Sequence, residues 1–171
     1  MTEPVSANAY RDWIGAEYIY TAPEEMGAAF IRQFAQAIGD LNPLYVNRAA
    51  AAQGPYGGIV APPTLVCETT QYYRGEVDDE GGFTDRPPMP PGQPIRAANE
   101  YVFHRPLRPT DIITACWRIS DIYDKHGQSG SLLFVQCKIT YTNQKHELLA
   151  ENTETLVYRL DGTADATKTN T

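Results

Sequence analysis

The chain has 171 residues and a net charge of −7, with 42% hydrophobic and 20% charged residues. These values are typical of one globular domain, and the acidic balance argues against nucleic acid or an anionic membrane surface as a partner. No apolar run approaches the ~20 residues that a membrane-spanning helix needs, and the first residues lack the basic and apolar regions of a signal peptide.

The first part of the chain predicts one short strand followed by a helix. Residues 16–20 have a strand-like pattern, and Thr21 to Glu24 match a capping box, in which Thr21 binds the Glu24 amide at a helix start. Gly39 supplies a signal for the end of that helix. The apolar face of the helix is predicted from residues at helical spacing, namely Met26, Phe30, Phe34, Ala37 and Ile38.

Two more helical segments are expected before the middle of the chain. A turn containing Asn42 and Pro43 precedes a short helical piece at residues 48–52. Pro62 and Pro63 then open a segment with little polar character apart from Glu68 and Gln71. A helix that is apolar nearly all round is a buried helix, so this segment predicts a helix covered by a sheet.

The second half of the chain predicts strands. Residues 74–94 are first acidic and then rich in proline, which predicts a long loop insertion. Four β-like runs follow, at residues 97–105, 112–123, 132–142 and 148–159, with hairpin connections at 124–130 and 143–146. Helices followed by strands indicate an α+β fold with an antiparallel sheet. Residues 161–171 lack periodicity and are predicted to be a disordered tail.

The three cysteines, Cys67, Cys116 and Cys137, have no spacing typical of a metal site. Each lies in an apolar or strand-like run. We interpret them as buried free thiols, which favours a reducing, cytoplasmic location.

Residues 38–45, Ile-Gly-Asp-Leu-Asn-Pro-Leu-Tyr, resemble the active-site segment of the MaoC-like dehydratases, the (R)-specific enoyl-thioester hydratases of the hotdog fold. In that family an Asp-x-Asn-Pro-x-His run carries both catalytic side chains. Asp40, Asn42 and Pro43 match the run, but Tyr45 stands where the family has His.

Two further segments resemble the same family. Residues 58–64 are similar to the entry to the central helix in its N-terminal-type, FAS1-like domains, and residues 103–112 resemble its F-x-x-P-x-x-x-G-D turn, with Thr110 replacing Gly. The resemblance covers about residues 16–160. It implies a hotdog fold, an antiparallel sheet wrapped around a long central helix, with residues 1–160 forming one domain.

The resemblance also implies chemistry that this chain only partly retains. Hydration of an enoyl thioester needs a base for water, a proton for the α-carbon and donors for the thioester oxygen. A phenol has an ordinary pKa near 10, against about 6.5 for imidazole, so Tyr45 is a poor substitute for His. Pro62 and Pro63 remove two amides where the oxyanion donors of the family begin.

The candidate catalytic residues are therefore Asp40 and Tyr45, as a degenerate pair. Asp40 has a competing role, because it can brace its turn together with Asn42. The expected substrate-binding residues are Asn42, Gly58, Ala61, Thr64, Tyr72, Tyr73, His104 and Arg105. Arg105 and Arg108, near Lys125, are candidates for attracting the phosphates of coenzyme A or a carrier-protein arm. No cofactor or metal is expected. The expected substrate is an acyl-CoA or an acyl-carrier thioester.

The resemblance is strongest to the non-catalytic half of two-hotdog enzymes such as mycobacterial (3R)-hydroxyacyl-thioester dehydratase. It implies a subunit that contributes the substrate channel to a partner hotdog with Asp and His. Three alternatives remain open. They are a self-sufficient homodimeric hydratase using Asp40 with Tyr45 or His104, a non-catalytic hotdog that binds acyl thioesters, and a thioesterase using Glu68.

Overall fold

The computed structural model describes residues 6–72, 79, 88–127 and 130–159. Tyr73, most of the predicted 74–94 loop and the 161–171 tail lie outside the described residues. The elements in chain order are a 3-10 helix η1 (Ala7–Trp13), β1 (Glu17–Thr21), α1 (Ala28–Ala37), α2 (Pro43–Val46), α3 (Arg48–Gln53), α4 (Leu65–Tyr72), β2 (Ile95–Phe103), β3 (Thr114–Gly127), β4 (Gly130–Thr142) and β5 (Leu148–Arg159).

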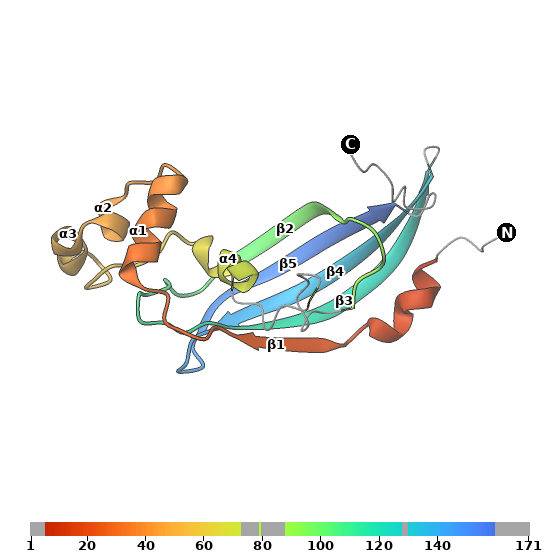
Figure 1. Ribbon diagram of the computed structural model, residues 1–171, viewed down its shortest axis with the longest axis horizontal. Helices are drawn as coiled ribbons and strands as arrows, with labels where there is room; N and C mark the ends of the chain where they lie inside the picture. Colours follow the sequence, from red (N-terminus) through yellow and green to blue (C-terminus); the bar gives the residue numbers. More distant parts are fainter. Residues whose placement is uncertain (1–5, 73–78, 80–87, 128–129, 160–171) are drawn as a thin grey trace.

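The five strands form one antiparallel sheet in the order β1-β3-β4-β5-β2, with β1 and β2 at its edges (Figure 1). Burial alternates along β4, where Leu133, Val135 and Ile139 are buried on one face, which we call the inner face. This alternation is what the sequence pattern predicted. The four strands predicted after residue 95 are confirmed, and so is the α+β class.

Helix α4 packs on the inner face of the sheet (Figure 1). Its Leu65 is fully buried and belongs to one core cluster with Ile139 and Tyr141 of β4. Truncating such a leucine typically costs 2–5 kcal/mol. A helix on the inner face of an antiparallel sheet is the hotdog arrangement predicted from the sequence. Of the long central helix that was expected, the structure describes eight residues.

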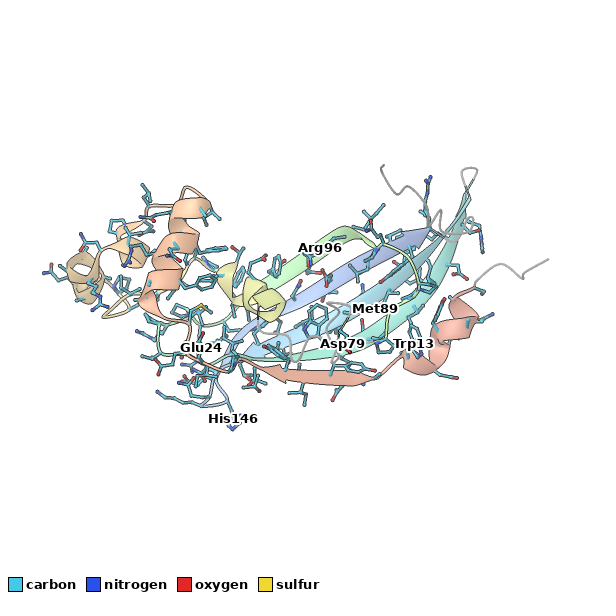
Figure 2. All side chains as sticks on the ribbon, viewed as in Figure 1. Trp13, Glu24, Asp79, Met89, Arg96 and His146 are labelled. Atoms are coloured by element: carbon cyan, nitrogen blue, oxygen red, sulfur yellow. The ribbon has the colours of Figure 1, made fainter. Side chains whose placement is uncertain are left out.

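A second apolar cluster lies at the other end of the inner face, under η1. Trp13 of η1 and Met89 both pack against it (Figure 2). The Ala7 amide donates to Asp124 at 2.9 Å, which fastens η1 to β3. The sequence did not predict η1, because its seven residues have no clear apolar periodicity.

The predicted capping box at residues 21–24 is wrong. Thr21 is the last residue of β1, and its hydroxyl lies 2.9 Å from the hydroxyl of Thr114 on β3. Helix α1 begins only at Ala28, after Gly27 with φ +77°. Strand pairing outcompeted the local capping signal, and the Met26 amide binds the Asp111 carbonyl instead of continuing a helix.

Strands β3 and β4 extend further toward one another along the chain than predicted. The strands continue to Gly127 and restart at Gly130, so His126 lies in a strand rather than in a turn. Cross-strand contacts explain this extension, because the Tyr123 and Phe134 rings stack with centroids 4.9 Å apart.

The helical segment α1–α3 lies at one end of the sheet, whereas the last residues of β3 and the first residues of β4 lie at the opposite end (Figure 1). The carboxyl end of β2 and the start of β5 face the helical end. In the part of the chain that the structure describes, no helix has the length and apolar character needed to cross a membrane.

Candidate functional site

The Asp40 segment begins where α1 ends. Gly39 adopts φ +75°, a conformation that favours glycine. Its amide donates to the Gln36 carbonyl, and the Asp40 amide donates to the Ala35 carbonyl at 2.9 Å. These bonds satisfy carbonyls at the helix end, and they place Asp40 directly beyond α1, as the sequence predicted.

Side-chain bonds hold the turn that follows. Asp40 Oδ1 accepts from the Asn42 amide at 3.2 Å, and Asn42 Oδ1 accepts from the Leu44 amide at 3.0 Å. Asn42 thereby caps α2, with Pro43 in its first turn. The bracing role considered for Asp40 is confirmed. The sequence predicted a turn here, and α2 itself was missed.

Tyr45 lies on α2 and packs against the core cluster around α4. Burial raises the pKa of the Tyr45 hydroxyl above its usual value, and the negative charge of Asp40 and the nearby Tyr56 raise it further. The phenol therefore stays protonated at neutral pH, where it can donate a hydrogen bond but cannot act as a base.

A cavity of about 390 Å³ opens beside Tyr45. Its lining includes Asn42 and Tyr56, Ala61 and Val66 from the segment before and within α4, and residues 103–107. We call this cavity the cleft. Its volume falls in the range of small-molecule sites.

The structure brings five of the predicted site residues together in the cleft. These are Asn42, Tyr45, Ala61, His104 and Arg105. Among the described residues, Asp40, Gly58 and Thr64 do not line it, and Asp40 lies exposed beside it. The side chain of Tyr72 and all of Tyr73 lie outside what the structure describes.

The imidazole in the cleft is held by a carboxylate other than Asp40. His104 Nε2 lies 2.7 Å from Glu151 Oε2, across β2 and β5. A carboxylate of this kind orients an imidazole and sets which ring nitrogen carries the proton. Glu151 was not singled out by sequence, because the β2–β5 register that places it there is a tertiary feature.

Arg105 is paired as well. Its guanidinium lies 3.2 Å from Glu147. The pKa of the Glu147 carboxyl is lowered, first by a hydrogen bond from Asn143 and then by the positive charge of Arg105. Arg108 donates to the Tyr56 carbonyl at 2.9 Å, so it joins two sides of the cleft.

The predicted proximity of Lys125 to these arginines is wrong. Lys125 pairs with Leu132, which in turn pairs with Arg159 at the end of β5, whereas Arg105 binds the Leu149 carbonyl at its start. Those two ends of β5 are separated by roughly 30 Å of strand.

The backbone amides near the entry to α4 are largely engaged. The Ala61 amide donates to the Leu107 carbonyl at 2.9 Å, and the Val60 amide donates to the Leu44 carbonyl at 3.2 Å. Pro62 and Pro63 have no amide hydrogen. Residues 60–63 therefore offer no free backbone amide to a developing oxyanion in this structure.

Asp111 and Asn143 form the main support of the turn beside the cleft. The buried Asp111 carboxylate accepts from the Arg108 amide at 2.7 Å and from Asn143 Nδ2 at 3.2 Å. Asn143 Oδ1 also accepts from the amides of Lys145 and Glu147. The F-x-x-P-x-x-x-G-D resemblance pointed to Asp111, but nothing in the sequence pointed to Asn143 as its partner.

Taken together, the cleft combines an apolar floor, amide and phenol donors, and two basic side chains paired with glutamates. It can hold a polar group with an apolar extension. The described residues contain no cluster of three or more His, Cys, Asp or Glu arranged to hold a metal ion.

Residues 12–152 match the FAS1-like dehydratase domain region. The chain belongs to this family. The MaoC-like resemblance found in the sequence is confirmed at the level of the family and of the hotdog fold. The five-stranded sheet with α4 on its inner face agrees with this assignment.

Individual relatives fit the family. The chain is 30% identical over 156 residues to a UPF0336 protein of Saccharopolyspora erythraea, covering 91% of this chain and 93% of the relative. It is 32% identical over 110 residues to the 3-oxo-4,17-pregnadiene-20-carboxyl-CoA hydratase alpha subunit of Mycobacterium tuberculosis, covering 59% of this chain and 34% of that protein. The fold is similar to the ChsH1-ChsH2 complex of Mycobacterium tuberculosis, with a TM-score of 0.70, 21% identity, and coverage of 93% and 92% of the two chains.

Proposed function

We propose that this FAS1-like dehydratase chain is the non-catalytic subunit of an acyl-thioester hydratase or dehydratase. It supplies part of the substrate channel, and a partner hotdog carries the Asp and His that move the proton. The substrate is an acyl-CoA or an acyl-carrier thioester.

One observation carries this proposal. The cleft is lined by residues from the segments that resemble the family's active site, but the Asp/His couple of the family is incomplete in this chain. Tyr45 replaces the His and stays protonated at neutral pH, and the imidazole that lines the cleft, His104, is bound to Glu151 rather than facing Asp40. The engaged Ala61 amide removes a further element of catalysis.

Exposed apolar surface supports a role in a complex. Ile38 and Leu41, on either side of the Gly39-Asp40 turn, are 51% and 62% exposed. Eight of the nine residues of β2 are exposed, and as an edge strand β2 offers unpaired backbone groups. A second hotdog pairing with this edge would cover Phe103 beside the cleft.

The apolar floor of the cleft suits an acyl chain, and Arg105 suits the phosphates of the carrier arm. One relative is named as the alpha subunit of a 3-oxo-4,17-pregnadiene-20-carboxyl-CoA hydratase. A bulky, ring-containing acyl group is therefore the first substrate class to examine.

The test is to purify this chain alone, and also with a MaoC-type hotdog that carries a complete Asp-x-Asn-Pro-x-His run and is encoded beside it. Hydration of a trans-2-enoyl-CoA is then followed by the loss of absorbance of the conjugated thioester. The chain alone should show no turnover above the uncatalysed rate, and the co-purified complex should be active. Turnover by the isolated chain at the rate of the complex would contradict the subunit role.

The matched control replaces the partner rather than this chain. A partner whose catalytic Asp is changed to Asn should still co-purify but should be inactive. If that complex remained active, the catalytic groups would have to lie on this chain.

A second candidate function is supported by the His104–Glu151 pair. A carboxylate-held imidazole that lines a cleft is an arrangement used for general bases. In a self-sufficient homodimeric hydratase, His104 would activate water through its other ring nitrogen. Activity of the isolated chain that is lost in His104→Gln would favour this candidate.

A further inference from the structure

A second cavity, of about 680 Å³, lies near the β3–β4 end of the sheet, far from the cleft. Its lining includes Leu132, Phe134 and Val157. On β4 and β5 these side chains alternate with the buried Leu133, Val135, Leu156 and Tyr158 of the inner face. The cavity is therefore on the outer face of the sheet, and we call it the outer groove.

The floor of the outer groove is apolar. Phe134 pairs with Val157, and Val157 pairs with Ile95, so these side chains form one row across three strands. Ile95 is 64% exposed. Phe134 is partly exposed, whereas Val157 is buried between its neighbours. The apolar surface that Ile95 and Phe134 leave open to water on this face has the character of a surface that binds an apolar group.

Two cationic side chains stand in the next row of the same face, two residues further along β4 and β5. Lys125 and Arg159 both pair with Leu132, one from each neighbouring strand, so they flank it. The Lys125 ammonium lies 4.9 Å from the centroid of the Phe134 ring, which keeps it over the groove. Both side chains are exposed.

The charge of the outer groove is opposite to that of the chain. The net charge is −7, but no carboxylate is among the residues that line the groove in the described part of the molecule. The ion pairs that the structure describes join Arg96, His104, Arg105 and Arg118 to glutamates, and neither Lys125 nor Arg159 takes part in them. A local positive field with an apolar floor selects an anion that has an apolar body.

We propose that the outer groove binds the carboxylate of a fatty acid, with the head group between Lys125 and Arg159 and the alkyl chain along Phe134, Val157 and Ile95. This site is separate from the cleft and does not depend on the function proposed for it. Two cationic side chains by themselves would attract any small anion. The adjacent apolar row restricts the ligand to an amphiphile.

The test is calorimetric titration of the full chain with decanoate at low ionic strength. Wild type should bind decanoate, and K125Q/R159Q should bind it about tenfold more weakly, since each charge contact at an exposed site contributes less than about 1 kcal/mol. Decan-1-ol, which keeps the chain length and lacks the charge, should bind more weakly by a similar factor. Added salt should weaken decanoate binding in wild type more than in the double variant.

Lys138→Gln is the matched control. Lys138 is exposed on β4 on the same outer face, outside the groove, so this variant should bind decanoate as wild type does. Thermal unfolding of each variant confirms that the fold is kept. Decanoate that also enters the cleft would bind wild type and K125Q/R159Q alike, so the difference between the two isolates the groove.

Three results would overturn the proposal. They are equal decanoate binding by wild type and K125Q/R159Q, an equal loss in Lys138→Gln, and decanol binding as tight as decanoate binding. A change in molecular mass of K125Q/R159Q on size-exclusion chromatography, with no decanoate binding by wild type, would instead show that the groove joins copies of the chain.

Discussion

His104 and Glu151 meet beside the cleft, where Nε2 and Oε2 lie 2.7 Å apart although both side chains are more than a third exposed. The pair joins the residue after β2 to the first part of β5, and the His104 amide also donates to the Leu149 carbonyl at 2.9 Å. The imidazole is thus fixed by the β2–β5 register, away from the position that the family His occupies next to Asp40.

This relationship separates the two candidate functions. In the proposed complex, His104→Gln should lower turnover by no more than about threefold, because the partner moves the proton. A general base would account for about 10²- to 10⁴-fold. Steady-state kinetics of enoyl-CoA hydration by the complex gives the answer. Glu151→Gln, which keeps a hydrogen-bonding side chain at the same place, is the control for the pair itself.

Tyr45→Phe should leave the turnover of the complex within about twofold of wild type between pH 6 and 9. The pKa of the Tyr45 hydroxyl is raised by burial and by the charge of Asp40, so the group stays neutral across this range and cannot contribute a titration. The pH profiles of the two proteins should superimpose. A basic limb that is present in wild type and absent in Tyr45→Phe would show that the hydroxyl takes part in the chemistry.

Asp40 is expected to act through the turn rather than through the reaction. Asp40→Ala removes the acceptor for the Asn42 amide and should lower stability by up to about 1 kcal/mol, the scale of such local side-chain caps. Asp40→Asn keeps an acceptor oxygen and should lose less. Urea unfolding of both variants measures the difference. If Asn and Ala abolished turnover of the complex alike, with stability intact, Asp40 would be catalytic.

Asn143 should be the most sensitive polar residue near the cleft. Its side chain makes bonds to Asp111, Glu147 and Lys145, and it is 96% buried. Asn143→Ala leaves the buried Asp111 carboxylate with one acceptor oxygen unsatisfied, so we expect a loss of roughly 2–4 kcal/mol. Thermal unfolding monitored by circular dichroism reports it. Lys145→Ala, in the same turn but contributing only its backbone, should change stability by less than about 0.5 kcal/mol.

Local patterns predicted most of the fold correctly. The four strands after residue 95, the stop at Gly39 and the short helix near residue 48 all rest on alternation, glycine and alanine content that act within a few residues. The helix start predicted at Thr21 was wrong because Thr21 pairs with β3, and this non-local pairing cannot be predicted from the residues next to Thr21. The predicted hairpin connection at residues 124–130 was too long, because pairing of β3 with β4 continues as far as Gly127 and Gly130.

Motif spacing predicted several of the residues that line the cleft, but it did not predict their ion-pair partners. Asn42, Tyr45, Ala61, His104 and Arg105 come from three segments of the chain, and all line one cleft. Their charge partners, Glu151 and Glu147, were missed because strand register decides which carboxylate faces which base. Lys125 was assigned to the wrong end of the molecule, since sequence alone does not give the direction of a strand relative to a site.

The cysteines provide a test of the core that is independent of the cleft. Burial raises the pKa of the Cys67 and Cys137 thiols to about 12. Only the thiolate reacts with a disulfide reagent, and at pH 8 a thiol of that pKa is ionised to roughly one part in ten thousand. Cys116 is half-buried, and its pKa is raised to a smaller degree.

In the native protein we therefore expect Cys116 to react first and the other two to react only as the protein unfolds, so that denaturant releases two further thiols. Cys116→Ser, which should remove the fast phase and leave the slow one, is the control. Fast reaction of two thiols in that variant without denaturant would mean that α4 and β4 do not form the closed core in which Cys67 and Cys137 lie.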